Sequence, residues 1–193
     1  HGVRDNGDSF LDEGAVTLAE RLHGAGYATA AAVGAEVTSR HWGFAQGFEA
    51  YYDDMGEARV GEQNRWRVER PGDAVVGDAL TWLVERDAAD TRPWFLWVHL
   101  FDPHHPYAAP EAWASQHPRH PYRAEIAWTD HLVDVLLEAL DERGDLDRTW
   151  VVAVGDHGEA LGNHGEGMHG TLLYDATTQV PLLVRPPGGM APR

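Results

Sequence analysis

The chain has 193 residues, 43% of them hydrophobic, which is enough for one domain with a sizeable core or for part of a larger one. It has no cysteine, which excludes disulfides, a thiolate nucleophile and thiolate metal ligands, and no apolar run is long enough to cross a bilayer. The net charge of −16 argues against a nucleic-acid-binding surface. All 15 basic residues are arginine, so this chain cannot fill a role that needs lysine.

Helices and strands are predicted to alternate along the chain. Apolar residues at helical spacing predict helices over residues 13–22, 73–86 and 122–143, the last with a buried stripe at Ile126, Thr129, Val133, Leu136, Leu137 and Leu140. Continuous apolar runs predict strands buried on both faces at Tyr27–Val33, Trp94–Leu100 and Trp150–Val154, and a short strand follows at Val180–Val184. The aromatic segment Ser39–Asp54 fits neither period and is interpreted as packed irregular structure. This order predicts an α/β fold with a largely parallel sheet, without an interdomain linker.

The stretch Thr149–Gly170, TWVVAVGDHGEALGNHGEGMHG, places polar side chains directly after a predicted buried strand. Asp156 and His157 come at the strand's carboxyl end, which is where ligands sit in open α/β sheets. A carboxylate and an imidazole side by side are a common pair of metal ligands. His164, Glu166 and His169 follow in a glycine-rich loop. The alternative interpretation is a polar strand-to-helix loop with solvated histidines.

A second histidine-bearing loop follows the strand Trp94–Leu100, with the sequence Phe101-Asp102-Pro103-His104-His105-Pro106-Tyr107. The two prolines exclude a regular element there. The two histidines therefore lie on a loop at the carboxyl end of a buried strand. Without further information, His104 is interpreted as a loop histidine stacked on Phe101 or Tyr107. His105 is adjacent and could take any role that falls to His104. His99 points into the predicted sheet and is interpreted as a core histidine.

Several motifs together resemble the sulfatase family of the alkaline-phosphatase-like superfamily. They are HGVRDNG at the start, TLAERLHGAGYATAAAV, FLWVHLFDPHHPY, and VVAVGDHGEALGNHGEGMHGTLLYD followed by VPLLVRPPG. The resemblance implies a three-layer α/β sandwich. It also implies that Asp156 and His157 are metal ligands, that His104 lies beside the leaving oxygen, and that His169 contacts the sulfate. The family implies calcium, with manganese or zinc as alternatives because a histidine is among the ligands.

The chain departs from the family pattern in two respects. The family makes its formylglycine nucleophile from a C/S-x-P-x-R motif that precedes the HGV segment, and this motif does not occur in the chain. The family's lysine after the second strand is also absent, since that region reads Val33-Gly34-Ala35-Glu36. We therefore expect residues 1–193 to be a partial, single catalytic domain that lacks the nucleophile segment, does not hydrolyse sulfate esters alone and binds metal weakly.

The function implied by the resemblance is metal-dependent hydrolysis of a small-molecule or glycan sulfate ester. In that reaction, His104 donates a proton to the leaving oxygen and His169 binds a sulfate oxygen, so both should meet Asp156 and His157 in one cleft. One alternative is a phosphodiesterase, phosphonate hydrolase or phosphoethanolamine transferase of the same superfamily. Another is a non-catalytic, truncated metal-binding module. The sequence leaves the oligomeric state and the cellular location open.

Overall fold

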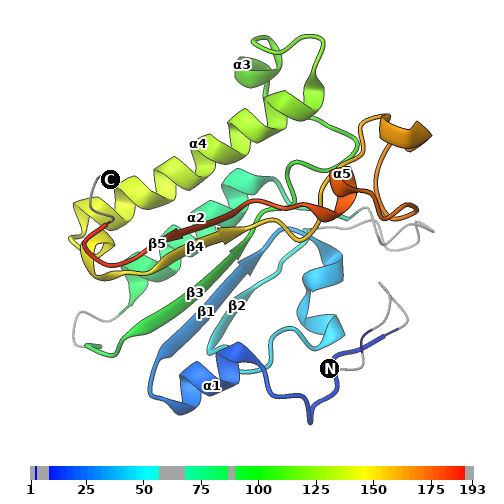
Figure 1. Cartoon of the computed structure of the whole chain (residues 1–193). Coiled ribbons are helices and arrows are strands. Elements are labelled where there is room, and N and C mark those ends of the chain that lie inside the picture. Colours follow the sequence, from blue (N-terminus) through cyan, green and yellow to red (C-terminus); the bar gives the residue numbers. More distant parts are fainter. Residues whose placement is uncertain (1–2, 4–8, 57–67, 87–89, 190–193) are drawn as a thin grey trace. The chain divides into compact units, whose positions relative to one another are not determined.

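The structure is a computed structural model that describes residues 3, 9–56, 68–86 and 90–189 (Figure 1). The chain divides into two compact units, residues 1–133 and residues 134–193. Most of the His1–Gly7 motif lies outside the described residues. Within the described ranges, no helix is both long enough and apolar enough to cross a membrane.

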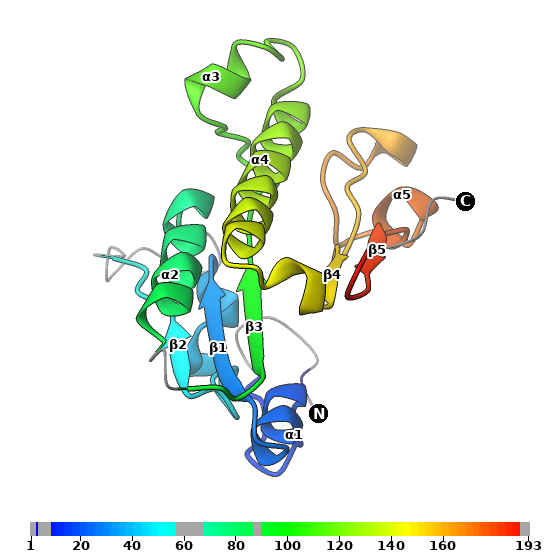
Figure 2. The ribbon, with the colours of Figure 1, turned by 90° about the vertical axis from the view of Figure 1, so that its left-hand side faces the viewer.

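The first unit is built on three parallel strands. Strand β1 (Ala28–Val33) lies between β2 (Ala50–Tyr52) and β3 (Trp94–His99), as Figure 2 shows. Ala30 of β1 pairs with Ala50 on one side and with Leu96 on the other. The predicted α/β class and parallel central sheet are therefore confirmed. The expectation of irregular structure is wrong for β2, whose three residues are too few to display a strand period.

Both faces of β1 are covered, and all six of its residues are buried. On one face, Ala32 packs with Val75 and Ala79 of helix α2 (Gly72–Glu85). On the other face, the ring of Phe48 stacks on those of Phe95 and Trp97, with centroid distances of 5.8 and 6.2 Å. Strand β3 is only half-buried, so the prediction of nearly complete burial is wrong for it. Its hydrogen-bonded neighbour within the described residues is β1 alone, which makes it an edge strand.

Helix positions follow the prediction closely, except at the first helix. Helix α1 (Leu18–Gly24) begins later than predicted because a capping box forms at Thr17. The hydroxyl of Thr17 accepts the N–H of Glu20 at 3.0 Å, and the Glu20 carboxylate accepts the N–H of Thr17 at 2.7 Å. The remaining short helical segments are α3 (Glu111–Ala114) and single 3₁₀ turns at Glu36–Thr38, Arg40–Trp42, Leu146–Arg148 and Asn163–Gly165.

Helix α4 (Pro121–Glu142) buries only part of the predicted stripe: Leu140 is 4% exposed, as predicted, but most of the buried face near the start of the helix was not predicted. Its buried residues include Glu125, Trp128 and Leu132, whereas Ile126 is 44% exposed. These three buried positions are spaced by three and four residues, so they form one helical face. The prediction began the stripe at Ile126 and did not include Glu125, one residue earlier.

The second unit contains β4 (Val151–Val154), α5 (Asp175–Thr178) and β5 (Leu182–Arg185). Strands β4 and β5 form a separate two-stranded antiparallel sheet. The prediction that Trp150–Val154 is a buried strand of the parallel sheet is therefore wrong, and Val152 and Val154 are 59% and 63% exposed. An apolar run indicates a strand, but it does not specify the partner or its direction.

Candidate active site

The loop after β4 carries the two predicted metal ligands. Nε2 of His157 lies 3.7 Å from Oδ1 of Asp156, so both atoms could contact one cation placed between them. Nδ1 of His157 lies 2.9 Å from the carbonyl oxygen of Gly158. A neutral imidazole that donates Nδ1–H to this carbonyl presents Nε2 as the metal-binding nitrogen. The donor set therefore fits two positions of a divalent-metal site.

His169 reaches the same loop from twelve residues further along the chain. Its ring stacks on that of His157, with a centroid distance of 4.0 Å and an interplanar angle of 30°. Its Nδ1 lies 3.2 Å from Oε2 of Glu159. The structure thus brings His169 together with Asp156 and His157 within the second unit, as predicted from the sequence.

The rest of this loop is held by its own polar and aromatic side chains. The carboxylate of Glu166 accepts the backbone N–H groups of Thr171 and Leu172, and the ring of His164 stacks on Tyr174 at 3.6 Å. A Cβ on Gly158 would lie 2.2 Å from the carbonyl oxygen of Ala176, so only glycine allows the loop to pass this close to α5. These contacts give Glu166 and His164 a role in the conformation of the loop.

The loop after β3 carries the predicted proton donor. The ring of His104 stacks on Phe101 at a centroid distance of 4.1 Å, and its Nδ1 lies 2.8 Å from the carbonyl oxygen of His105. The alternative interpretation, in which His104 stacks on Phe101, is therefore observed. The stack uses the face of the imidazole ring rather than the edge that carries the nitrogen atoms. The ring of His105 meets Tyr107 edge-on at 5.8 Å. His99 has its Nδ1 3.4 Å from the N–H of Gly34, which supports its interpretation as a core histidine.

A buried carboxylate that the sequence interpretation missed lies beneath this loop. Glu125 of α4 is 2% exposed and accepts the backbone N–H of His104 and of Ala108. Burial raises the pKa of Glu125 to about 7, and the nearby charges of Asp102 and Glu69 act in the same direction. Burial also raises the pKa of Asp102 and of Glu69. The signal in the sequence was the position of Glu125 on the same helical face as Trp128 and Leu132.

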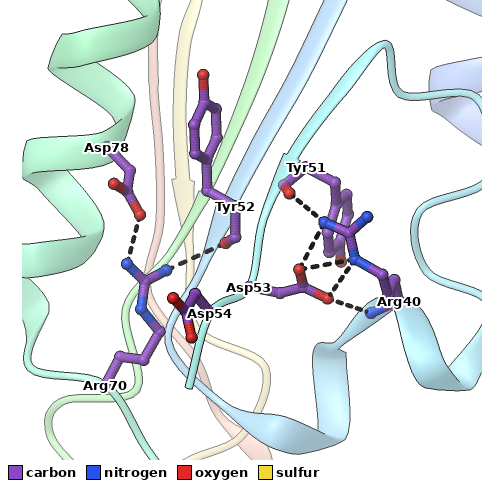
Figure 3. A pocket seen from close by; sticks show the side chains of 7 residues that line it. All are labelled: Arg40, Tyr51, Tyr52, Asp53, Asp54, Arg70 and Asp78. Atoms are coloured by element: carbon purple, nitrogen blue, oxygen red, sulfur yellow. Dashed lines mark hydrogen bonds and ion pairs between the residues drawn. The ribbon is translucent and has the colours of Figure 1, made fainter. Parts of the chain in front are cut away.

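A polar pocket opens beyond the carboxyl end of β2 (Figure 3). Its volume is about 420 Å³, and it is lined by Arg40, Tyr51, Tyr52, Asp53, Asp54, Arg70 and Asp78. Arg40 binds Asp53, with Nε at 2.8 Å from Oδ1, and Arg70 is paired with Asp78. Both arginines are paired with aspartates of the same lining, and these ion pairs account for the polar residues of the pocket without a ligand.

The site residues are distributed over the two units of the chain. Asp156, His157 and His169 come together in the second unit, and His104 lies in the first. Within the described residues, no three histidine or acidic side chains are arranged to hold a metal ion. The meeting of His104 with His169 in one cleft stays a prediction.

The fold and these motifs define the class of protein. The Sulfatase family model matches residues 3–193, and the chain belongs to the sulfatase family. An arylsulfatase of Chlamydomonas reinhardtii is 37% identical over 59 residues, which are 31% of this chain and 9% of that protein. An uncharacterized sulfatase of Escherichia coli, YidJ, is 42% identical over 43 residues, which are 22% of this chain and 9% of that protein.

Solved structures share the fold at low sequence identity. A Bacteroides fragilis protein described as a candidate sulfatase, yidJ, has a TM-score of 0.74 at 17% identity over 95% of this chain and 52% of that one. A phosphonate monoester hydrolase of Agrobacterium radiobacter has a TM-score of 0.68 at 19% identity, over 93% of this chain and 54% of that one. A protein solved with its substrate D-glucosamine-2-N,6-O-disulfate has a TM-score of 0.70 at 16% identity, over 95% of this chain and 57% of that one. The chain thus spans about half the length of these structures.

Proposed function

We propose that the protein is a sulfatase that hydrolyses sulfate esters with a divalent metal ion and a formylglycine nucleophile supplied from outside residues 1–193. The observation that carries this proposal is the group of Asp156, His157 and His169 on one loop, in a chain of the sulfatase family. In hydrolysis the ester's S–O bond breaks, the alcohol leaves with a proton, and water supplies the hydroxyl that ends on the sulfate.

Asp156 and His157 are proposed to hold the metal ion through Oδ1 and Nε2. Calcium is the ion that the family resemblance implies, and manganese or zinc are the alternatives because Nε2 of His157 is a nitrogen ligand. A bound divalent cation neutralises charge on the non-bridging sulfate oxygens and activates the nucleophile. The ion also offsets the acidic character of a chain with a net charge of −16, which would otherwise repel a sulfate ester.

The two remaining histidines are proposed to act directly on the ester. His104 donates a proton to the leaving oxygen, and general acid catalysis of this kind contributes roughly 10²- to 10⁴-fold in rate. His169 donates a hydrogen bond to a sulfate oxygen, with its ring plane held by the stack on His157. His105 replaces His104 in this scheme if its ring is the one that meets the substrate.

The substrate is proposed to be a small-molecule or glycan sulfate ester. Support comes from the fold likeness to the protein solved with a sulfated glucosamine. Which ester the protein prefers depends on parts of the substrate site beyond the reacting group, and a panel of sulfated monosaccharides alongside an aryl sulfate would rank them.

The test is an assay of the full-length protein with an aryl sulfate, before and after metal removal with a chelator. We expect activity to disappear on chelation and to return with calcium, or with manganese or zinc. Asp156→Ala and His104→Ala should each lower kcat/KM by about 10²-fold or more. His120→Ala is the matched control, because His120 is exposed and lies on the chain segment before α4. Full activity of Asp156→Ala in the presence of chelator would overturn the proposal.

A second candidate function is hydrolysis of phosphonate monoesters on the same site. The fold likeness to the Agrobacterium radiobacter enzyme favours including it. An aryl phosphonate monoester should therefore be assayed in parallel, and the higher kcat/KM of the two substrates identifies the main reaction.

A further inference from the structure

The loop after β3 has an unusual shortage of backbone donors. Pro103 and Pro106 have no N–H group, so this segment cannot join a strand ladder, and its remaining N–H groups need other acceptors. Two of them find the same side chain: the N–H of His104 donates to Oε2 of Glu125 at 3.0 Å, and the N–H of Ala108 donates to Oε1 at 2.5 Å. One carboxylate therefore fixes both ends of the five-residue segment 104–108.

Burying this carboxylate lowers the stability of the folded protein. Glu125 is among the largest fully buried side chains, and its helix partners on the same face, Trp128 and Leu132, are apolar. The charged groups that face it are both acids, Asp102 from the loop after β3 and Glu69 from the segment before α2. An apolar residue at this position would avoid the burial of a carboxylate among like charges. Such an arrangement is characteristic of sites where function takes precedence over stability.

We propose that Glu125 is a positioning residue of the active site, which holds the segment 104–108 so that an imidazole of this segment meets the leaving oxygen of the substrate. The proposal rests on the proposed function for its catalytic consequence, but the clamp itself is independent of it. Both candidate proton donors, His104 and His105, lie inside the clamped segment, so the role of Glu125 holds for either of them. The clamp on its N–H, the Nδ1 contact with the His105 carbonyl and the stack on Phe101 all help to hold His104 in place.

The clamp should depend on pH. The ionised carboxylate accepts both N–H groups, whereas the protonated acid turns one oxygen into a donor and weakens one of the two bonds. Because burial raises the pKa of Glu125 to about 7, this change falls within the range in which enzymes are assayed. Asp102 and Glu69 keep the transition at high pH, since both add negative charge around Glu125.

The first experiment measures the clamp in the full-length protein without substrate. The amide ¹H–¹⁵N resonances of His104 and Ala108 are followed from pH 5 to pH 9 in the wild type, Glu125→Gln and the control Glu138→Gln, an exposed position on the same helix. We expect both amides to shift with one shared midpoint near pH 7 in the wild type and in Glu138→Gln, and this transition to be absent in Glu125→Gln. Independent midpoints for the two amides in the wild type would overturn the clamp. This outcome is read from the wild type alone, so it does not depend on whether a variant folds.

The second experiment measures catalysis in the full-length protein with an aryl sulfate. Glu125→Gln keeps the size of the side chain but offers one acceptor, and Glu125→Asp keeps the charge but is too short to reach both N–H groups. Since a displacement of about 1 Å at a catalytic group can lower the rate about 10²-fold, we expect kcat of Glu125→Gln to fall about 10- to 100-fold with KM within about twofold. Glu125→Asp should lose less, and Glu138→Gln should match the wild type.

The outcomes separate this proposal from the proposed function. A wild type that does not hydrolyse the aryl sulfate contradicts the proposed function, while the amide titration still decides the clamp. An active wild type with an unchanged kcat and pH profile in Glu125→Gln contradicts the positioning role alone. A fall in thermal stability with unchanged kcat would show that Glu125 serves only the fold.

Discussion

Oε2 of Glu159 lies 3.2 Å from Nδ1 of His169, and only 5% of the Glu159 side chain is exposed. A buried carboxylate that accepts the N–H of one imidazole nitrogen fixes the orientation of the ring. When both ring nitrogens of His169 carry a proton, Nδ1–H donates to Glu159 and Nε2–H is the group that would donate to a sulfate oxygen, and the stack on His157 fixes the ring plane. Glu159 therefore connects the orientation of His169 to the DHGE motif itself.

Glu159→Gln should lower kcat/KM of the full-length protein for an aryl sulfate by about 10- to 100-fold, the usual loss for a residue that orients a site histidine. The imidazole ¹⁵N shifts of His169 report the protonation of its ring nitrogens directly and should change in the same variant. Asp141→Asn, at an exposed position of α4, is the control and should leave both quantities unchanged. Unchanged ¹⁵N shifts in Glu159→Gln would contradict the role of Glu159.

Two glycines of α2 should respond in opposite directions to alanine. A Cβ on Gly72 would lie 2.5 Å from Cδ1 of Leu132 and 2.9 Å from Oδ2 of Asp102, so Gly72→Ala forces these two side chains to shift. We expect a loss of about 1–3 kcal/mol in the free energy of unfolding, as for other overpacked sites. Gly77 has nothing within 4 Å of such a Cβ, so Gly77→Ala should stabilise the helix by about 0.5–1 kcal/mol.

Urea unfolding of both variants checks this prediction. The two changes add the same methyl group to the same helix, so the difference between them reports mainly the close approach at Gly72. Equal stabilisation of the two variants would show that Leu132 and Asp102 relax without cost.

The local parts of the fold and the parallel pairing of β1 with β3 were predictable from the sequence, whereas the pairing of β4 was not. The apolar runs located β1, β3 and β4 within one residue, because short runs without charge that are bounded by turn residues favour buried strands. The same runs carry no information on neighbours, so the antiparallel pairing of β4 with β5 could not be read from Val151–Val154. The half-burial of β3 has the same origin, since it depends on what lies beside an edge strand.

The part of the candidate site that could be predicted consists of residues whose chemistry and position in the sequence both indicate a ligand site. Asp156 and His157 follow a strand directly, and His169 is close enough in the chain to return to them. Glu125 was missed because a single glutamate inside a helix is normally solvated, and only its tertiary contacts distinguish it. Arg70 was missed for the same reason: it is 8% exposed, although it lies next to a charged segment.

The stability of the protein should fall as the pH rises from about 4.5 to about 7. The pKa of Glu125 is raised from 4.5 to about 7, so the folded state binds this proton more tightly than the unfolded state does. The contribution of Glu125 is therefore fully present below the unfolded value and is lost as the pH rises through the folded value. Asp102 and Glu69 have raised pKa values as well and act in the same direction.

Glu125→Gln isolates this effect because glutamine does not titrate. Relative to the wild type, the variant should gain up to about 3 kcal/mol between pH 4.5 and pH 7, which corresponds to the shift in pKa. Urea unfolding of both proteins at a series of pH values gives this difference directly. A stability difference that stays constant over this range would show that Glu125 has an ordinary pKa in the folded protein.

Arg70, which is buried, should contribute far more to stability than Arg92, which is exposed but makes more ion pairs. Its side chain is 9% exposed; Nη1 donates to the carbonyl oxygens of Val33 and Tyr52, and Nη2 pairs with Asp78 (Figure 3). Arg70→Met keeps the length of the side chain but leaves two carbonyl groups and a one-third exposed carboxylate without their donor. We expect a loss of about 2–3 kcal/mol in the free energy of unfolding, discounted for the solvent that reaches Asp78.

Arg92 is the matched comparison, because its side chain is 45% exposed and pairs with both Glu49 and Asp90. Exposed ion pairs are screened by water and salt, so Arg92→Met should cost much less than Arg70→Met. The loss at Arg92 should also shrink in 1 M salt, whereas the loss at Arg70 should persist, because hydrogen bonds to buried carbonyl groups are not screened. Urea unfolding of both variants at low and high salt measures the two losses. Equal losses for the two arginines would contradict the structural role assigned to Arg70 at the carboxyl ends of β1 and β2.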